Sequence, residues 1–303
     1  MIVTLTANPS VDRTYLVGTL RPGGLHRARA GWSEASGKGV NVSRVLGRLG
    51  VPARTVVTAG GGEGRLLLDL LAGLDGVTAV PVAGRTRVNV TVVVDSGEPT
   101  KVNEPGSPLS GVEADALLAA LERALVCARW LACCGSLPSG TDPALVGRLV
   151  ATGRAARVPV AVDASGPALE VAVAHRADLL KPNRDELAEL AGGPVGSVAA
   201  AYAAAREVAG RTGGAVLVSL GADGALLVTA HGAWSAQGPP ITPVNTTGAG
   251  DALLAGFLAA DGAAPAGRLA SAVAVATSAC LSPATADLPD RLVSPAAVTV
   301  RPL

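Results

Sequence analysis

The 303-residue chain is nearly neutral, with 25 basic and 24 acidic side chains and a formal net charge of +1. Proteins that bind nucleic acids or anionic membranes usually show a basic excess, so we expect neither partner. Aromatic residues make up only 2% of the chain, which leaves few surfaces for stacking on bases. With 49% hydrophobic residues, the chain can bury a large core as one α/β domain or two smaller ones.

The four cysteines contain no C-x-x-C pair, and two of them, Cys133 and Cys134, fall in an apolar run. We interpret all four as buried free thiols, which indicates a reducing compartment. Residues 1–5 read as a first strand and lack the basic and apolar regions of a signal peptide. The most apolar later stretch, 269–281, is too short to span a bilayer. A cytoplasmic protein is therefore predicted.

Two segments of the first hundred residues, 15–31 and 87–101, contain stretches in which apolar and polar residues alternate. Alternation with a period of two is typical of half-exposed strands. We predict a small antiparallel sheet from about residues 13–31 and 86–103, beside the main part of the protein. This sheet would be a lid, a dimer surface or both. No low-complexity linker sets it apart, so we treat 1–303 as a single domain.

From about residue 111 onward, helical and strand patterns alternate along the chain. Thr141 or Asp142 would cap the second of these helices, with Pro143 at its first position. Strands separated by helices of this length favour an α/β fold, with a mainly parallel central sheet flanked by helices. The predicted helices are 112–126, 143–156 and 197–212, and the predicted strands are 130–134, 158–162, 179–180, 215–219 and 225–229.

Polar residues directly follow four of these strands. The carboxyl ends of parallel strands gather at one edge of a sheet, where ligands bind in open α/β folds. That edge is therefore where a site is expected. The four polar segments are 135–136, 163–165, 181–183 and 219–221.

The segment Asn245-Thr246-Thr247-Gly248-Ala249-Gly250-Asp251 precedes an apolar helical run at 252–260. Small residues at a helix start let backbone N–H groups approach an anion, which the helix dipole also favours. Asp251 then lies in the first turn, beside any phosphate that those groups hold. A carboxylate there is well placed to take a proton from an attacking hydroxyl. The alternative is a capped helix whose aspartate only complements the dipole.

A second glycine-rich segment, Ser36-Gly37-Lys38-Gly39-Val40-Asn41-Val42-Ser43, leads into a helical pattern at 42–49. It is not a Walker A loop, because that motif has four residues between its first glycine and the Gly-Lys pair, and a Ser or Thr after the lysine. Here Gly31 is one residue too far away, and Gly39 follows Lys38. A lysine between two glycines, with Asn41 nearby, suits hydrogen bonding to a polyhydroxyl ligand. An ordinary loop before a helix is the alternative.

Other segments carry weaker signals. Asp12 follows the first strand and is available to accept hydrogen bonds from vicinal hydroxyls. Asn183 and Glu186 form either a capping-box pair or positions that hold Mg²⁺ or its waters. The segment 219–224 is a hairpin turn or a turn that packs on a nucleotide, and Arg87 taken alone is a solvated charge. The histidines lack metal spacing, and the glycine pattern of a Rossmann dehydrogenase and the G-x-S-x-G of a hydrolase are absent.

Taken together, these segments resemble the ribokinase-like (PfkB) carbohydrate kinases, and within them the phosphofructokinase and tagatose-phosphate kinase branch. The resemblance covers essentially the whole chain, with its motifs in the family's order. The motifs are Asn8-Pro9-Ser10-Val11-Asp12, Gly37-Lys38-Gly39-Val40-Asn41-Val42, Thr86-Arg87-Val88-Asn89-Val90, Gly135-Ser136-Leu137-Pro138, Lys181-Pro182-Asn183, Ser219-Leu220-Gly221 and Gly248-Ala249-Gly250-Asp251.

The resemblance implies a kinase that transfers a phosphoryl group from ATP, with Mg²⁺, to a phosphorylated sugar. It also implies a ribokinase-like fold whose lid sheet commonly forms a homodimer interface. Asp251 looks like the catalytic base, and Gly248, Ala249 and Gly250 look like the anion hole. The residues expected to bind the sugar and its own phosphate are Asp12, Arg27, Gly37, Lys38, Gly39, Asn41, Arg87 and Ser136. Those expected to bind ATP are Lys181, Asn183, Glu186, Ser219, Gly221, Gly224, Thr246 and Ser282, with Glu186 reaching Mg²⁺ through water and adenine near 278–282.

Among acceptors, fructose 1-phosphate ranks first on the motifs around Lys38 and Arg87, followed by fructose 6-phosphate or tagatose 6-phosphate. Two positions depart from the family: Ser36 stands where Gly or Ala is usual, and Leu25 stands where a relative specific for fructose 6-phosphate has Lys. An unphosphorylated sugar or nucleoside is disfavoured, because the positive charges of Lys38 and Arg87 would then have no phosphate to bind. An inactive binding or regulatory protein is disfavoured by the intact Asp251. Assistance by a monovalent cation such as K⁺ stays open.

Overall fold

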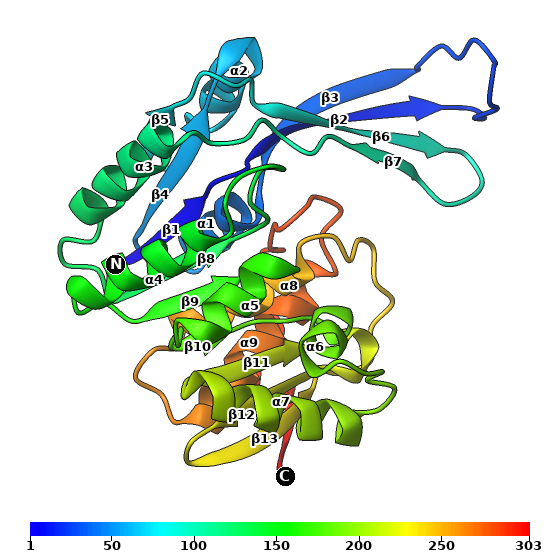
Figure 1. Cartoon of the computed structure of the whole chain (residues 1–303). Coiled ribbons are helices and arrows are strands. Elements are labelled where there is room, and N and C mark those ends of the chain that lie inside the picture. The colour runs from blue at the N-terminus through cyan, green and yellow to red at the C-terminus, as the bar shows by residue number, and fades with distance from the viewer.

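The computed structural model describes residues 1–303, and its main feature is a ten-stranded sheet flanked by helices (Figure 1). From β5 through β4, β1, β8, β9 and β10 to β11 the neighbouring strands run parallel, and β12, β13 and β14 extend the sheet in antiparallel pairs. The expectation of a mainly parallel sheet is confirmed. The strands are β1 (Ile2–Thr6), β4 (Ala53–Ala59), β5 (Val77–Pro81), β8 (Trp130–Cys134), β9 (Val160–Asp163), β10 (Leu179–Leu180), β11 (Ala215–Ser219), β12 (Ala225–Thr229), β13 (Gly232–Gln237) and β14 (Thr299–Pro302).

Helices cover both faces of this sheet. On one face α8 packs against both α1 and α9. On the other face α3, α4, α5, α7 and α6 form a chain of neighbours in that order, while α2 packs on β4 (Figure 1). The helices are α1 (Lys38–Arg48), α2 (Gly61–Leu70), α3 (Gly111–Ala124), α4 (Ala144–Ala155), α5 (Pro167–Ala174), α6 (Arg184–Ala191), α7 (Val198–Thr212), α8 (Ala249–Ala259) and α9 (Pro265–Ala279).

The central strands are buried on both faces, which explains why they read as continuous apolar runs. Every residue of β1, β8 and β9 is buried. Side chains that alternate along each strand feed two separate hydrophobic cores; for example, Leu131 joins the larger core and Ala132 the core under α8 and α9. Both cores therefore depend on the same strands, which fixes the position of each strand end.

The small sheet projects from the main body, as Figure 1 shows. Its order is β3-β2-β6-β7, and its strands are β2 (Ser10–Val17), β3 (Ala30–Ser36), β6 (Arg87–Val94) and β7 (Thr100–Asn103). The outer pairs are antiparallel, as predicted, but the central pair β2–β6 is parallel because the chain crosses through the main sheet between them. Residues 18–29, which we expected to be strand, form no strand. We refer to these four strands as the lid sheet.

Two local predictions need correction. Helix α1 begins at Lys38, four residues earlier than predicted, because its N-cap Gly37 (φ 136°) allows the chain to turn directly from β3 into the helix. The cysteines are all free, but Cys127 is exposed at the turn after α3, so only Cys133 and Cys134 are buried thiols. No helix is both long and apolar enough to cross a membrane.

Candidate active site

The segment expected to hold an anion forms the start of α8. Gly248 is the N-cap with φ 83°, and its backbone approaches the chain at Ala286 so closely that an added Cβ would lie 2.9 Å from the Ala286 nitrogen. Only glycine fits that conformation and that space. No side chain caps the helix. The Ala249 N–H donates to the Thr246 carbonyl oxygen (3.2 Å), so the N–H groups of Gly248, Gly250 and Asp251 are the ones left for a ligand.

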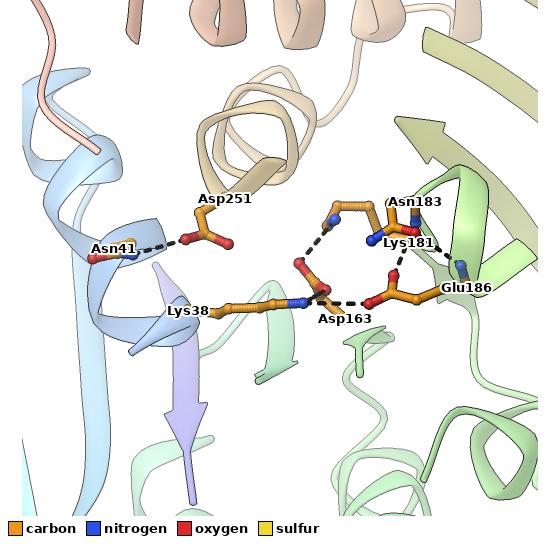
Figure 2. A network of polar contacts seen from close by, with 7 residues as sticks. All are labelled: Lys38, Asn41, Asp163, Lys181, Asn183, Glu186 and Asp251. Carbon is orange, nitrogen blue, oxygen red and sulfur yellow. Dashed lines mark hydrogen bonds and ion pairs between the residues drawn. The ribbon is translucent and has the colours of Figure 1, made fainter. Parts of the chain in front are cut away.

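Asp251 lies in the first turn of α8 and is buried, with 6% of its surface exposed. Its Oδ2 accepts a hydrogen bond of 2.8 Å from Nδ2 of Asn41, one turn into α1 (Figure 2). Burial, and then the nearby negative charge of Asp163, raise the pKa of Asp251 to about 7, while Asn41 and two lysines oppose the rise. A carboxylate with a pKa close to neutral is suited to accept a proton near physiological pH.

Opposite Asp251, four charged side chains meet at the carboxyl ends of β9 and β10. Lys38 Nζ lies 2.7 Å from Asp163 Oδ1 and 3.8 Å from Glu186 Oε1, and Lys181 Nζ lies 3.0 Å from Asp163 Oδ2 (Figure 2). Burial opposes the charge of Lys38, but its bond to Asp163 and the other carboxylates raise its pKa. Both lysines are therefore held in place by a carboxylate that is wholly buried.

Asn183 and Glu186 form a complete capping box at the start of α6, as one of the two sequence interpretations predicted. Oε2 of Glu186 accepts a hydrogen bond from the Asn183 nitrogen, whereas Oε1 accepts none and lies near Lys38. Nowhere do three or more His, Cys, Asp or Glu side chains come close enough to hold a metal ion. The residues present would fit Mg²⁺ that arrives on phosphates, since the free Oε1 of Glu186 could accept a hydrogen bond from one of its waters.

On the lid sheet, Asp12 is held by its neighbours. Its Oδ1 accepts hydrogen bonds from Ser10 Oγ (2.7 Å) and Asn89 Nδ2 (2.9 Å). The Oδ1 atoms of Asn89 and Asn41 are buried and have no hydrogen-bond partner. Buried acceptors without a partner are rare in native structures, so a ligand with hydroxyl groups would satisfy them here.

Arg87 is not the solvated charge that its sequence position alone suggested. Its Nη1 donates to the Glu104 carbonyl oxygen (3.2 Å), its Nε is buried without a partner, and burial lowers its pKa while Asp12 opposes that shift. Ser136, the other residue expected at this phosphate, accepts a hydrogen bond on its Oγ from Asn8 Nδ2 (3.3 Å). A half-buried guanidinium with a free donor is suited to a phosphate.

The remaining predicted residues fall into two groups. The first group consists of two glycines that allow close packing. A Cβ added to Gly37 would lie 2.7 Å from the Thr6 side chain, and one added to Gly39 would lie 2.5 Å from it. The absence of a side chain at both positions therefore lets α1 approach the end of β1. The second group consists of the residues expected around the nucleotide. Ser219 and Asn183 form an isolated β-bridge, and Gly221 and Gly224 lie in the turn of the β11–β12 hairpin. Thr246 is exposed, and Ser282 Oγ donates a hydrogen bond to Asp287. Arg27 lies in an exposed loop and makes no side-chain hydrogen bond or ion pair.

Sequence reasoning left Asp163 and Asn89 out of the candidate residues. Each had a signal: Asp163 ends a fully buried strand at the predicted ligand edge, and Asn89 belongs to the alternating pattern on the same face as Asp12. A cavity of about 730 Å³ lies elsewhere, between α1 and the 284–287 loop, and does not include Asp251.

Comparison with known proteins shows the family to which the chain belongs. Residues 5–291 match the model of the pfkB family carbohydrate kinases. The chain is 36% identical to the 1-phosphofructokinase of Rhodobacter capsulatus over 85% of this chain and 82% of that protein. It is 34% identical to the ATP-dependent 6-phosphofructokinase isozyme 2 of Mycobacterium tuberculosis, over 84% and 76% respectively.

Solved structures agree with the sequences. Phosphofructokinase-2 from Escherichia coli in complex with fructose-6-phosphate superposes with a TM-score of 0.84 at 31% identity, covering 92% of this chain and 93% of that one. Other structures of that enzyme contain potassium or describe a tetrameric inhibited form. The predicted ribokinase-like fold is confirmed. The chain belongs to the pfkB family of carbohydrate kinases and is an ATP-dependent sugar-phosphate kinase.

Proposed function

We propose that the protein transfers the γ-phosphoryl group of ATP to the free terminal hydroxyl of fructose 1-phosphate and so forms fructose 1,6-bisphosphate. The observation that carries this proposal is Asp251. It is buried, its pKa is raised to about 7, and it lies in the first turn of a helix whose uncapped N–H groups face the same space.

In the proposed step, the acceptor oxygen forms a bond to the γ-phosphorus while the bond from that phosphorus to the β,γ-bridging oxygen breaks. The acceptor proton moves to Asp251, and the electron pair of the broken bond leaves with ADP. The N–H groups from Gly248 to Gly250 stabilise the charge on the transferring group, as backbone donors do in other acyl- and phosphoryl-transfer sites.

The acceptor's hydroxyl groups would bind to Asp12, the Gly37–Gly39 backbone and Asn41. The unpartnered Oδ1 atoms of Asn41 and Asn89 supply acceptors that such hydroxyls satisfy. The acceptor's own phosphate would bind to Arg87, whose buried Nε lacks a partner, with Ser136 beside it. Arg27 is added only if the exposed loop that carries it folds over the substrate.

ATP would lie along the carboxyl edge of β10 and β11, against Asn183, Ser219 and the hairpin glycines Gly221 and Gly224, with Lys181, Thr246 and Ser282 around it. Glu186 Oε1 would accept a hydrogen bond from a water on Mg²⁺, the metal that neutralises charge on the phosphates when bound. A monovalent cation such as K⁺ is a further candidate, supported by the potassium complex of the Escherichia coli relative.

The choice of fructose 1-phosphate rests on the relatives, several of which are named 1-phosphofructokinase. Fructose 6-phosphate is the second candidate, because the solved relative binds it, and tagatose 6-phosphate belongs with it. Leu25, which is 81% exposed, supplies no cation to a 6-phosphate, and this favours the first choice.

We also propose that the protein is a cytoplasmic homodimer that pairs through its lid sheet. The support is a set of exposed apolar side chains on and beside that sheet: Tyr15, Leu25, Trp32 and Val102. Exposed apolar side chains gathered on one part of a surface are typical of an interface.

The proposal is tested by identifying the product. With fructose 1-phosphate and MgATP, ³¹P NMR should show a second phosphomonoester on the sugar in step with ADP. A product formed only from fructose 6-phosphate or tagatose 6-phosphate would keep the reaction and replace the substrate.

A further inference from the structure

The segment that follows β7, residues 104–107, contacts the side chains expected at the acceptor's phosphate, although it belongs to none of the sequence motifs. We call this segment the strap. The β6–β7 ladder ends at the pair Asn89 and Asn103, so the strap begins where the lid sheet ends. It leads from there to α3 in the main body (Figure 1). The strap therefore connects the lid sheet to the rest of the protein.

Glu104, the first residue of the strap, binds the chain around Arg87 with both of its carboxylate oxygens. Its Oε2 accepts a hydrogen bond from the Val88 nitrogen (2.9 Å), which lies beyond the last β6–β7 pair. Its Oε1 accepts a hydrogen bond from Arg85 Nη2 (2.6 Å). The bond from Val88, and then the bond from Arg85, lower the pKa of this carboxyl, which is therefore charged at neutral pH. The carboxylate thus fixes the chain on both sides of Arg87.

The backbone of Glu104 holds the Arg87 guanidinium itself. Its carbonyl oxygen accepts the one hydrogen bond that the guanidinium donates, from Nη1 (3.2 Å), and the Arg87 Nε is buried without a partner. Asp12 acts on Arg87 by its charge but makes no hydrogen bond or ion pair with it. A planar guanidinium recognises a phosphate through the direction of its N–H groups. The direction in which Arg87 points therefore depends on Glu104.

The next two strap residues hold the second side chain expected at the phosphate. The buried Asn8 donates from Nδ2 to the Pro105 carbonyl oxygen (3.1 Å) and to Ser136 Oγ (3.3 Å). Gly106 leaves room for this amide, because an added Cβ would collide with Asn8 Oδ1. Arg87 and Ser136 are thus tied to two consecutive residues of the strap, the first directly and the second through Asn8.

We propose that Glu104 is a positioning residue for the acceptor's phosphate: it orients Arg87 and anchors the strap that, through Asn8, holds Ser136. This inference rests on the proposed function and assigns a role within it. A carboxylate would repel the phosphate, so Glu104 acts through Arg87 and does not itself bind the acceptor. The alternative is that Glu104 only ends the lid hairpin, which would affect stability without affecting acceptor binding in particular.

The kinetic test compares Glu104→Ala and Glu104→Gln with Glu98→Ala, an exposed glutamate in the β6–β7 turn, each checked for native circular dichroism. With the acceptor that the wild type turns over best, Glu104→Ala should raise KM by about three- to tenfold, the effect of one lost hydrogen bond, and leave kcat within about twofold. Glu104→Gln keeps an acceptor for the Val88 N–H and should recover most of this loss. Glu98→Ala should match the wild type.

A double-mutant cycle separates positioning from a purely structural role. Adding Glu104→Ala to Arg87→Ala should raise KM by less than about twofold further, because the arginine that Glu104 positions is already gone. If the two substitutions instead multiply in their effects on KM, Glu104 acts independently of Arg87 and the proposal is wrong. A fall in kcat with an unchanged KM in Glu104→Ala would overturn it as well.

A measurement without turnover separates this proposal from the choice of substrate. The ¹⁵Nε–H NMR signal of Arg87, identified by its absence in Arg87→Ala, reports on the guanidinium in the ligand-free protein. It should be sharp in the wild type and in Glu98→Ala, because the Nε is buried, and broadened or lost through exchange with water in Glu104→Ala. A signal that is unchanged in Glu104→Ala, or already missing in the wild type, would show that Glu104 does not hold Arg87. Absence of turnover in the wild type would instead count against the proposed function, and the NMR result would still decide the role of Glu104.

Discussion

Replacing Asp251 by Asn tests the proposed base most sharply, because the change removes the charge and keeps the shape. Asn41 can still donate a hydrogen bond to the new amide oxygen, so the packing between α1 and α8 should persist. Without the base, kcat should fall by about 10²–10⁴-fold. The affinity for MgADP should change little, because Asp251 bonds to α1 and not to the expected nucleotide residues. ADP release and calorimetry measure the two quantities.

The same substitution should stabilise the protein at high pH. The pKa of Asp251 is raised by burial from its ordinary value of 3.8 to about 7. Between these values the folded state keeps a proton that the unfolded state has lost, so stability falls as pH rises through this window. The loss reaches at most about 4 kcal/mol above pH 7. Asp251→Asn should therefore raise the free energy of unfolding at pH 8 and leave it nearly unchanged at pH 4.

Urea unfolding at both pH values measures this difference, with the exposed Asp69→Asn in α2 as the matched control. In the wild type, kcat/KM should rise with pH up to about 7 and then level off, since the base must be deprotonated. Turnover retained by Asp251→Asn would refute its role as base. A variant that is no more stable than wild type at pH 8 would refute the raised pKa of this buried carboxylate.

Three further outcomes are expected. Arg87→Ala should raise the KM for a phosphorylated acceptor by about tenfold or more and largely keep kcat, whereas the control Arg148→Ala in α4 should leave both unchanged. Steady-state kinetics measure both constants, and an unchanged KM would contradict the role of Arg87 in binding the phosphate. Gly39→Ala should destabilise the protein by about 1–3 kcal/mol, because the added Cβ would clash with β1. Gly47→Ala on the same helix meets open space and should stabilise the protein by up to about 1 kcal/mol. Equal unfolding midpoints for the two variants would argue against this packing. Trp32→Glu, on the lid sheet, should convert a dimer into monomers in light scattering, and an unchanged mass would exclude the lid as the interface.

Much of the main sheet could be predicted from sequence because its strands are buried on both faces. The run 130–134 coincides with β8, and 215–219 and 225–229 coincide with β11 and β12. The spacing of apolar residues predicted a helix start less well where no capping side chain marks it. Gly37 starts α1 through its own backbone conformation, so the apolar pattern placed the helix start too late.

The candidate site shows the same division. Asp251 and its glycines could be found because adjacent residues carry the signal. Asp163 could not be ranked among several polar residues at the sheet edge, because its importance comes from contacts with Lys38 and Lys181, which are 125 and 18 positions away in the sequence. The half-buried state of Arg87 likewise depends on Glu104, which reaches it from beyond β7. Pairings of this kind arise from tertiary structure and leave no local pattern.

The most direct measurement of the central claim is ADP release by the purified protein with MgATP and a panel of acceptors. The panel holds fructose 1-phosphate, fructose 6-phosphate, tagatose 6-phosphate, free fructose, ribose and adenosine. The proposed function predicts turnover with one phosphorylated ketose, fructose 1-phosphate, and little with any unphosphorylated compound. Turnover only with free fructose, ribose or adenosine would contradict the role given to Arg87, and no turnover with any acceptor would contradict the proposed reaction.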